Sequence, residues 1–317
     1  MMAIVANTFQ TYGAKGIREE LSNVIANISP EETPFQSNVG SESVANAFFE
    51  WQTDSLAATS TTAILSGDDV ASFDTTAATT RLGNYTHIRR RTLILEDRLE
   101  FVDKAGRDSE LAYQLAKRGK ELKRDIEATL LDNNARVGGN STTPPETAGL
   151  PSWLVSNIDE AGDATNATGD GTDARVDGTQ RAFTEAMVTS IMQQAWTAGG
   201  NPSIVMTGPF NKVAASSFQG IAETRVAGGD SPTTIIGAAD VYVSDFGNLT
   251  FVPNRFQRER DAFFLDPEYA AVCYLRPIQQ VELAKTGDAE KRMVIAEFGL
   301  KVMNEEAHGA AYDLTDS

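Results

Sequence analysis

The stretch from Lys104 to Asn134, KAGRDSELAYQLAKRGKELKRDIEATLLDNN, decides the fold because it predicts one long helix between segments that lack a helical pattern. Its apolar residues recur at spacings of four, seven, four and four, which puts them on one side of a helix. These residues are Leu111, Leu115, Leu122, Ile126 and Leu130. Asp108 and Ser109 supply a capping start and Asn133 begins a stop, so roughly 25 residues should be helical over about 38 Å. A helix of this length needs a core along one whole side.

The opposite face of this predicted helix is basic. Lys117, Lys120 and Arg124 fall nearly opposite the apolar stripe, whereas Glu121 and Asp125 lie on a flank. Such a face can meet phosphate groups, or it can simply be solvated beside acidic neighbours. Both interpretations stay open at this point.

Composition narrows the protein class. The chain has 317 residues and a net charge of −17, from 27 Lys and Arg against 44 Asp and Glu. This charge keeps a protein soluble and argues against wrapping nucleic acid over the whole surface, so any such contact must be local. No run of about 18 apolar residues is present, and the first residues lack a basic start followed by an apolar core. We therefore expect no signal peptide and no contact with a membrane.

The residues that usually carry catalysis or bind metals are scarce. Cys273 is the single cysteine and lies in an apolar run, so we expect a buried, inert thiol. The two histidines, His87 and His308, are too few for the metal sites that Cys and His clusters build. Phosphate-binding loops, nucleophile elbows and zinc-protease helices are absent. The sequence therefore predicts no enzyme, no metal and no cofactor.

The segment before the long helix divides into two parts. Residues 15–28 have a short amphipathic pattern followed by proline breakers, which predicts either an arm with one helix or an ordinary first helix. Residues 41–95 begin with an aromatic strand at Phe48, Phe49 and Trp51 and end with a β-rich segment. The residues between are rich in Ala, Ser, Thr and Asp. A connection this long leaves the body of the subunit, or it is a disordered surface loop.

Three consecutive arginines, Arg89, Arg90 and Arg91, lie in the returning strand. Side chains alternate along a strand, so Arg89 and Arg91 should point one way and Arg90 the other. A solvated face, a nucleic-acid patch and salt bridges to acidic groups of neighbouring subunits are the alternatives, and we favour the salt bridges.

The rest of the chain predicts an α+β fold. Residues 137–179 carry seven acids against one base, Arg175, which favours a solvated loop over a calcium site. Helices are expected at 184–198 and 209–218, and a buried strand at 203–207. Further strands are expected at 241–244, 249–252, 262–265, 270–275, 279–283 and 293–303.

Two runs of sequence resemble the major head proteins of tailed bacteriophages similar to phage SU10. The first comprises FVDKAGR from Phe101, SELAYQLA from Ser109 and KELKRDIE from Lys120. The second comprises LDPEY from Leu265, YLRP from Tyr274, LAKTGD from Leu283 and NEEAHG from Asn304. Together these runs span most of the chain.

The resemblance implies a fold of the Hong Kong 97 type. It implies an N-terminal arm at 1–40, an extended loop at 41–95, and a peripheral domain at 96–150 and 276–305 with a spine helix at 105–136. The axial domain would comprise 151–275 and 306–317. A hairpin around Thr286, Gly287 and Asp288 would form the peripheral tip.

The same resemblance implies a function. The chain would be a major capsid protein that self-assembles, as hexamers and pentamers, into the icosahedral head shell around the double-stranded DNA of a tailed phage. A portal, and separate scaffolding or decoration proteins, would be further partners, and the protein would pass from the host cytoplasm into the virion. An encapsulin-like compartment and a calcium- or carbohydrate-binding surface protein are the alternatives, although fixed repeats are absent.

Assembly by loops and arms points to specific residues. The expected contacts between subunits are Phe48, Phe49, Trp51, Ile64, Leu65, Phe73, Arg89 and Arg91. In related capsids the spine helix lies toward the inner surface, which suggests that Lys117, Lys120 and Arg124 approach the packaged DNA without reading its sequence.

Overall fold

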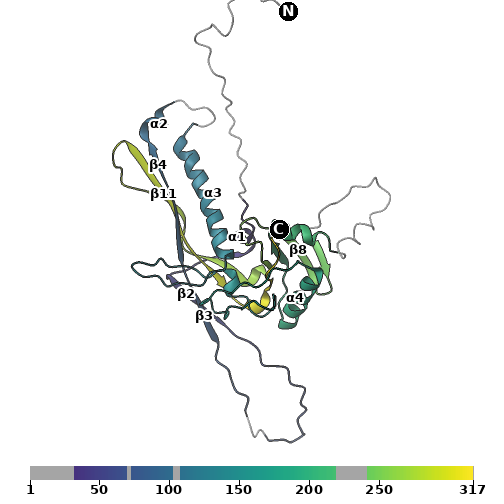
Figure 1. The fold of residues 1–317 in the computed structure, drawn as a ribbon. Coiled ribbons are helices and arrows are strands. Elements are labelled where there is room, and N and C mark those ends of the chain that lie inside the picture. Colours follow the sequence, from purple (N-terminus) through teal and green to yellow (C-terminus); the bar gives the residue numbers. More distant parts are fainter. Residues whose placement is uncertain (1–31, 70–72, 103–107, 219–240, 317) are drawn as a thin grey trace, which may run out of the picture.

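The computed structural model describes residues 32–69, 73–102, 108–218 and 241–316 (Figure 1). The helix predicted at 15–28 and part of the predicted arm lie outside these residues. Among the described residues, no helix is long and apolar enough to cross a membrane.

The long helix is present as α3, Glu110–Leu131, with 22 residues. It is shorter than the predicted 105–136. The Ser109 side chain caps it by accepting a hydrogen bond from the backbone N–H of Ala112, as the sequence predicts. At the other end, Asp132 is extended and the Asn134 side chain donates to the carbonyl of Thr147, so the chain leaves the helix early. Leu122, Ile126 and Leu130 are fully buried, which confirms the apolar stripe.

The helix packs on a four-stranded sheet, along β4 and β11. The order is β1 (Gly40–Ser43), β10 (Ala270–Glu282), β11 (Ala289–Val302) and β4 (His87–Glu96), with β1 parallel to β10 and the other pairs antiparallel. The strands predicted at 270–275 and 279–283 are one strand, because two register shifts carry β10 past Pro277. β10 and β11 form a hairpin whose turn contains Gly287 in the left-handed region, at φ +74°.

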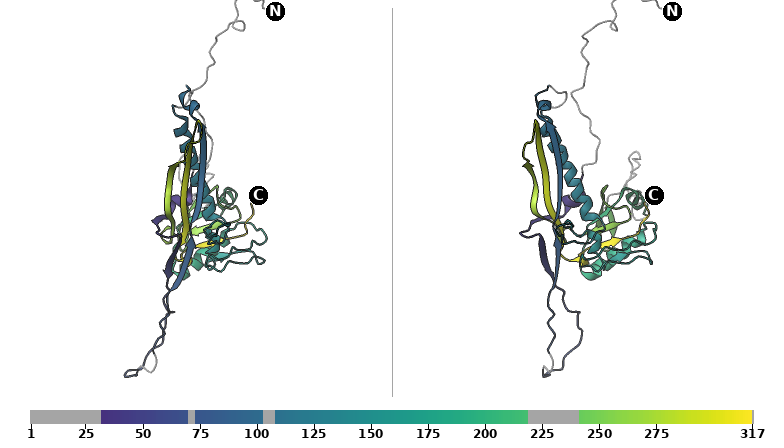
Figure 2. Two further views of the ribbon diagram at one scale, coloured as in Figure 1. Left: turned by 90° about the vertical axis from the view of Figure 1, so that its left-hand side faces the viewer. Right: turned by 60° about the vertical axis from the view of Figure 1, so that its left-hand side comes forward.

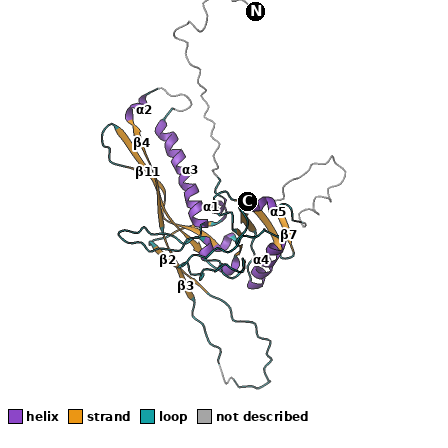
Figure 3. Cartoon of the chain, viewed as in Figure 1, coloured by secondary structure: helices purple, strands orange, loops and turns teal. Residues whose placement is uncertain are grey.

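A six-stranded sheet forms the second layer of the molecule. Its order is β5 (Ile158–Asp159), β12 (Gly309–Ala311), β9 (Ala262–Leu265), β6 (Ile204–Thr207), β8 (Gly247–Pro253) and β7 (Val241–Ser244). α4 (Glu185–Ala198) and α5 (Pro209–Ala215) accompany it, and α4 ends at Gly199 with φ +97°. Helices and strands therefore mix in the α+β manner (Figure 3).

The segment 137–179 differs from the solvated loop that its acidity predicts. It contains the short 3-10 helix η2 (Leu150–Ser152), and Leu150, Trp153 and Leu154 are buried in the main core. Its one base, Arg175, is also buried. Hydrophobic burial of a few apolar side chains thus fixes a stretch whose composition is otherwise polar.

The remaining elements are the strands at the root of the extended loop and four short helices. β2 (Phe48–Thr53) and β3 (Thr80–Tyr85) form a two-stranded ribbon, and the described residues 54–69 and 73–79 extend far from the body beyond it (Figures 1 and 2). α1 (Pro34–Asn38) lies beside the lower part of α3, and α2 (Asp97–Phe101) follows β4. The 3-10 helices η3 (Pro267–Tyr269) and η4 (Glu305–Ala307) connect strands.

Candidate assembly interface

The extended loop presents large apolar side chains that the subunit does not cover. Leu56 is 99% exposed, and Ile64, Leu65 and Phe73 are 81%, 82% and 87% exposed. Scattered exposed apolar residues are ordinary, but four on one projecting loop form a surface that another molecule can bury. Leu56 was not among the residues that the sequence pattern nominated.

The aromatic residues at the root of the loop do not belong to this surface. Phe49 and Trp51 are each 8% exposed and lie in the main core, where the Trp51 and Trp153 ring centroids are 5.2 Å apart. Phe48 is partly buried, 4.6 Å from the ring of Tyr85. The expectation that Phe49 and Trp51 contact a neighbour is wrong, because one face of β2 packs into its own subunit.

The arginine run also has partners within the chain. Arg91 makes two hydrogen bonds of 2.7 Å to the Asp125 carboxylate on α3, a bidentate pair. The Arg89 guanidinium lies 3.5 Å from the Thr129 hydroxyl, also on α3. Arg89 and Arg91 therefore share one face of β4, as predicted, and Arg91 pairs with an acid of its own subunit.

The other face of the four-stranded sheet is open. Figure 2 shows α3 on one side of β4 and β11, whereas on the opposite side Phe49 of β2 lies against β11 only near its end, at Gly299. Ile88 and Ile94, which are 42% and 65% exposed, alternate with Arg89 and Arg91 and so belong to this open face together with Arg90. Lys291 pairs with Ile94 across the strands and shares its face. By the same register Glu96 shares this face, as does the buried Glu297, which pairs with Arg276. The open face is thus apolar with both basic and acidic side chains.

The basic side of α3 is only partly available. Lys117 and Lys120 are exposed, and so is Lys123, which the sequence analysis did not single out. The Arg124 guanidinium lies 5.5 Å from the centroid of the Phe256 ring and is partly buried. The lysines are therefore better placed than Arg124 to contact an external anion.

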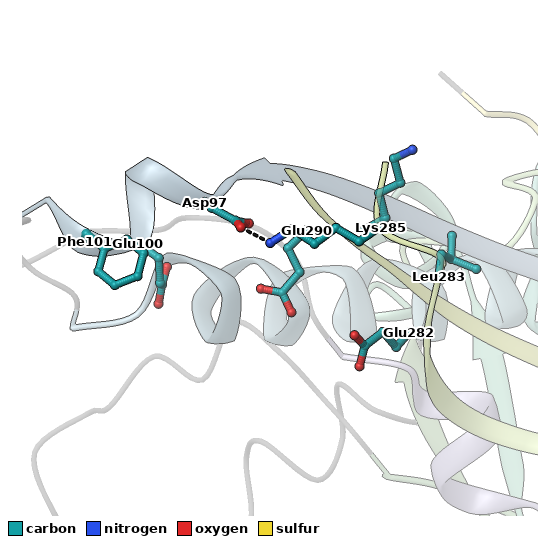
Figure 4. Close-up of a pocket in the computed structure, with 8 residues that line it drawn as sticks. Asp97, Glu100, Phe101, Glu282, Leu283, Lys285 and Glu290 are labelled. Carbon is teal, nitrogen blue, oxygen red and sulfur yellow. Dashed lines mark hydrogen bonds and ion pairs between the residues drawn. The ribbon is translucent and has the colours of Figure 1, made fainter. Parts of the chain in front are cut away.

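A hollow of about 310 Å³ lies at the far tip of the sheet (Figure 4). Asp97, Glu100, Glu282 and Glu290 line it, and the Lys285 ammonium pairs with Asp97. The neighbouring Phe101 is 89% exposed. Within the described part of the chain, no three His, Cys, Asp or Glu side chains are grouped so as to hold a metal ion.

The single thiol and the two imidazoles are held in their neutral forms near pH 7. Burial raises the pKa of the Cys273 thiol to about 12, so the thiolate nucleophile does not form near neutral pH. Burial also lowers the pKa of His87 and of His308 to about 4. The acids of 163–177 are engaged: Asp163 accepts hydrogen bonds from Thr179, and Asp177 pairs with Arg175.

Several buried charged groups were missed by sequence reasoning, among them Arg175 and Glu127. Arg175 is fully buried in its side chain, pairs with Asp313 at 2.9 Å and lies 4.0 Å from the ring centroid of Tyr312. Its position as the one base among seven acids was an available signal. Glu127 on α3 is fully buried next to the apolar stripe, and no local pattern marks it.

Comparison with known proteins gives one consistent result. A family model described as SU10 major capsid protein matches residues 4–315. The major capsid protein of Escherichia phage Phieco32 is 28% identical over 344 aligned residues, which cover 96% of each chain.

Solved structures share the fold. A chain of the Cyanophage A-1(L) capsid asymmetric unit matches with a TM-score of 0.69 and 12% identity, over 97% of this chain and 99% of that one. A chain of the holo-SrpI encapsulin complex from Synechococcus elongatus PCC 7942 matches with a TM-score of 0.53 and 10% identity, over 92% of each. Identities this low speak for a common fold and not for a common cargo.

Proposed function

The chain belongs to the SU10 major capsid protein family, and from this we propose that it self-assembles into the icosahedral head shell that encloses the double-stranded DNA of a tailed phage. Membership in this family makes the chain a major capsid protein and a component of a phage virion. The icosahedral symmetry, the DNA cargo and the contacts below are parts of the proposal.

The observation that carries the proposal is the exposed apolar surface of the extended loop. Burying one Leu, Ile or Phe side chain contributes about 1.5–3 kcal/mol. The isolated subunit leaves four such side chains in water, at Leu56, Ile64, Leu65 and Phe73. Contacts repeated around a ring would recover this free energy many times over in a closed shell.

The open face of the four-stranded sheet is a suitable receiver for this loop in a neighbouring copy. Residues 54–79 carry four acids and no base, and Asp68 and Asp69 are exposed near Ile64 and Leu65. The open face offers Ile88 and Ile94 beside basic side chains. The isoleucines of this face suit the apolar side chains of the loop, and the exposed Arg90 suits its carboxylates.

The domain assignment follows from the two sheets. We assign α3 and the four-stranded sheet to the peripheral domain and the six-stranded sheet to the axial domain. β4 pairs with β11, which supports moving residues 87–95 from the extended loop into the peripheral domain. The loop proper would then be β2, residues 54–79 and β3.

The further partners follow from the role in a head. Copies would meet as hexamers and pentamers, one vertex would hold a portal, and scaffolding or decoration proteins could join in the host cytoplasm. Lys117 and Lys120 would face the packaged DNA, with Arg124 in a supporting position. No catalytic role is proposed for any residue.

An encapsulin-like compartment remains the second candidate because an encapsulin shares the fold. Family membership favours the phage head over it. The calcium- or carbohydrate-binding alternative loses its basis because the acids that suggested it are hydrogen-bonded to their own neighbours.

Electron microscopy of the purified full-length chain tests the proposal. We expect closed icosahedral shells or capsomers, whereas a dispersed monomer at all concentrations would count against it. Replacing Ile64 and Leu65 together by Asp should yield free, folded subunits. The matched control, Thr61→Asp with Thr62→Asp, adds the same charge to exposed positions of the same loop and should still assemble.

A further inference from the structure

Glu127 is a charged side chain with no exposure to solvent, on the side of α3 that faces the core. Its Oε1 accepts hydrogen bonds from the backbone N–H of Phe35, at 2.6 Å, and from the Asn254 side chain, at 2.8 Å. Its Oε2 accepts from the backbone N–H and the side-chain amide of Gln36, at 3.1 and 3.0 Å. Four donors therefore surround one carboxylate.

These donors come from two distant parts of the chain. Phe35 and Gln36 belong to α1, directly after the described chain begins at residue 32. Asn254 follows the last residue of β8 in the six-stranded sheet, and its backbone N–H donates to the Thr207 carbonyl of β6. Glu127, on the long helix α3, is thus hydrogen-bonded both to α1 and to the end of β8 in the six-stranded sheet.

Packing alone does not call for a carboxylate here. Ile126 and Leu130 already fill the core beside it, and an ionised group loses its hydration on burial. That loss is the main reason why the pKa of Glu127 is raised, and the hydrogen bonds from Phe35, Gln36 and Asn254 oppose the shift. The two oxygens of the Glu127 carboxylate each accept two hydrogen bonds and so match the four donors. A neutral side-chain amide would place its own NH2 group against fixed backbone N–H groups, which cannot accept a hydrogen bond.

Gln36 and Phe35 complete the attachment. The Gln36 side-chain amide also donates to the Lys123 carbonyl one turn earlier on α3, at 2.9 Å. The Phe35 side chain is fully buried in the main core. The backbone and the side chains of α1 are therefore held by the same stretch of α3.

We propose that Glu127 is a positioning residue for assembly, which anchors the root of the N-terminal segment at residues 34–38 to α3 and to the six-stranded sheet. The segment before residue 34 then departs from one fixed place, and contacts that it makes with a neighbouring copy begin in register. This inference rests on the proposed function for its role in assembly, but the anchor itself is a property of the single subunit.

The test uses the full chain with Glu127→Gln, which keeps the size and removes the charge. Amide hydrogen–deuterium exchange of unassembled subunits should be about ten- to a hundred-fold faster in peptides covering 33–39, because charge-assisted hydrogen bonds are lost there. Exchange in β10 and β11 should not change. Glu121→Gln, whose carboxylate pairs with Arg118 on the same helix, is the matched control and should leave residues 33–39 protected.

The outcomes distinguish the anchoring of residues 34–38 within one subunit from its role in shell assembly. Unchanged exchange at 33–39 in Glu127→Gln would overturn the inference, as would faster exchange everywhere, which indicates general destabilisation. Faster local exchange with a normal yield of shells would overturn the role in assembly. A wild-type chain that never forms shells would contradict the proposed function but would not contradict the hydrogen-bonded anchor at Glu127.

A second variant covers the case in which Glu127→Gln does not fold. Gln36→Ala removes the side-chain bonds to Glu127 and Lys123 from a partly exposed position. It should make exchange at 33–39 several-fold faster without changing β10 and β11, and unchanged exchange there would again count against the anchor.

Discussion

Asp261 shows how strongly a single buried carboxylate can depend on its surroundings. It is fully buried, neither of its oxygens has a hydrogen-bond donor within the described residues, and the nearest Arg258 nitrogen is 3.4 Å away. Burial raises the pKa of Asp261 to about 7, although Arg258 and Arg175 oppose the shift. Asp177 and Asp313 add to the rise through their negative charge.

This pKa gives a pH dependence with a definite sign. Between pH 3.8, the ordinary pKa of the group, and about 7, the folded state holds a proton that the unfolded state has lost. Its contribution to stability therefore falls as pH rises through this range. The asparagine of Asp261→Asn cannot ionise. The free energy of unfolding of this variant minus that of wild type should therefore rise by about 2 kcal/mol from pH 5 to pH 8.

Urea unfolding at several pH values measures this difference. Asp69→Asn removes the same charge from the exposed loop and serves as the control. A difference between Asp261→Asn and wild type that stays constant from pH 5 to pH 8 would contradict the prediction.

At the scale of elements, the ribbon of β2 and β3 connects the core of the subunit to its projecting loop. Its root supplies core residues such as Phe49 and Trp51, whereas every described residue of 54–79 is exposed. Thr53 pairs with Thr80 across the two strands, so a short turn can close the ribbon at that point. The core therefore ends where the loop begins.

Replacing residues 55–78 by a short glycine–serine linker should change the free energy of unfolding by less than about 1 kcal/mol, because no core residue is removed and the shorter loop is easier to close. The same variant should form no shells. Urea unfolding and electron microscopy of the same preparation check both halves. A marked loss of stability would show that the loop packs on its own subunit, and normal shells would show that it does not join copies.

At the scale of the whole molecule, charge is distributed unevenly. The chain carries a net charge of −17, yet α3 presents Lys117, Lys120 and Lys123 on one exposed side. In a shell with this side inward, the lysines would meet phosphate groups while the general acidity limits adhesion of DNA elsewhere.

Lys117→Gln with Lys120→Gln should weaken binding of DNA by assembled shells and lower the slope of log affinity against log salt concentration by about 2. Arg124 is left in place because its guanidinium packs over Phe256. Arg81→Gln with Arg98→Gln removes two charges from β3 and α2 and should leave the slope unchanged. Equal slopes for both variants and wild type would mean that the α3 lysines form a solvated face.

Local patterns in the sequence determined the elements. The leucine spacing and the Ser109 cap predict α3, and alternation or short apolar runs predict most strands of the C-terminal half, because both signals depend on residues a few positions apart. The α+β class and the family resemblance also came from the sequence by itself. The ends of α3 and the continuity of β10 past Pro277 did not, since tertiary contacts decide where an element stops.

Only the tertiary structure decided which residues are surface and which are core. Trp51 packs on Trp153, Arg91 binds Asp125, and Glu127 binds backbone amides 92 and 91 positions away. No period of two or 3.6 residues records such pairs, because they form when separate elements meet and satisfy one another's buried polar and apolar groups. The sequence by itself thus determined a capsid fold with an outward loop. The structure decided that the exposed apolar side chains of the loop begin beyond its aromatic root, and that Arg91 and Glu127 bind groups of their own subunit.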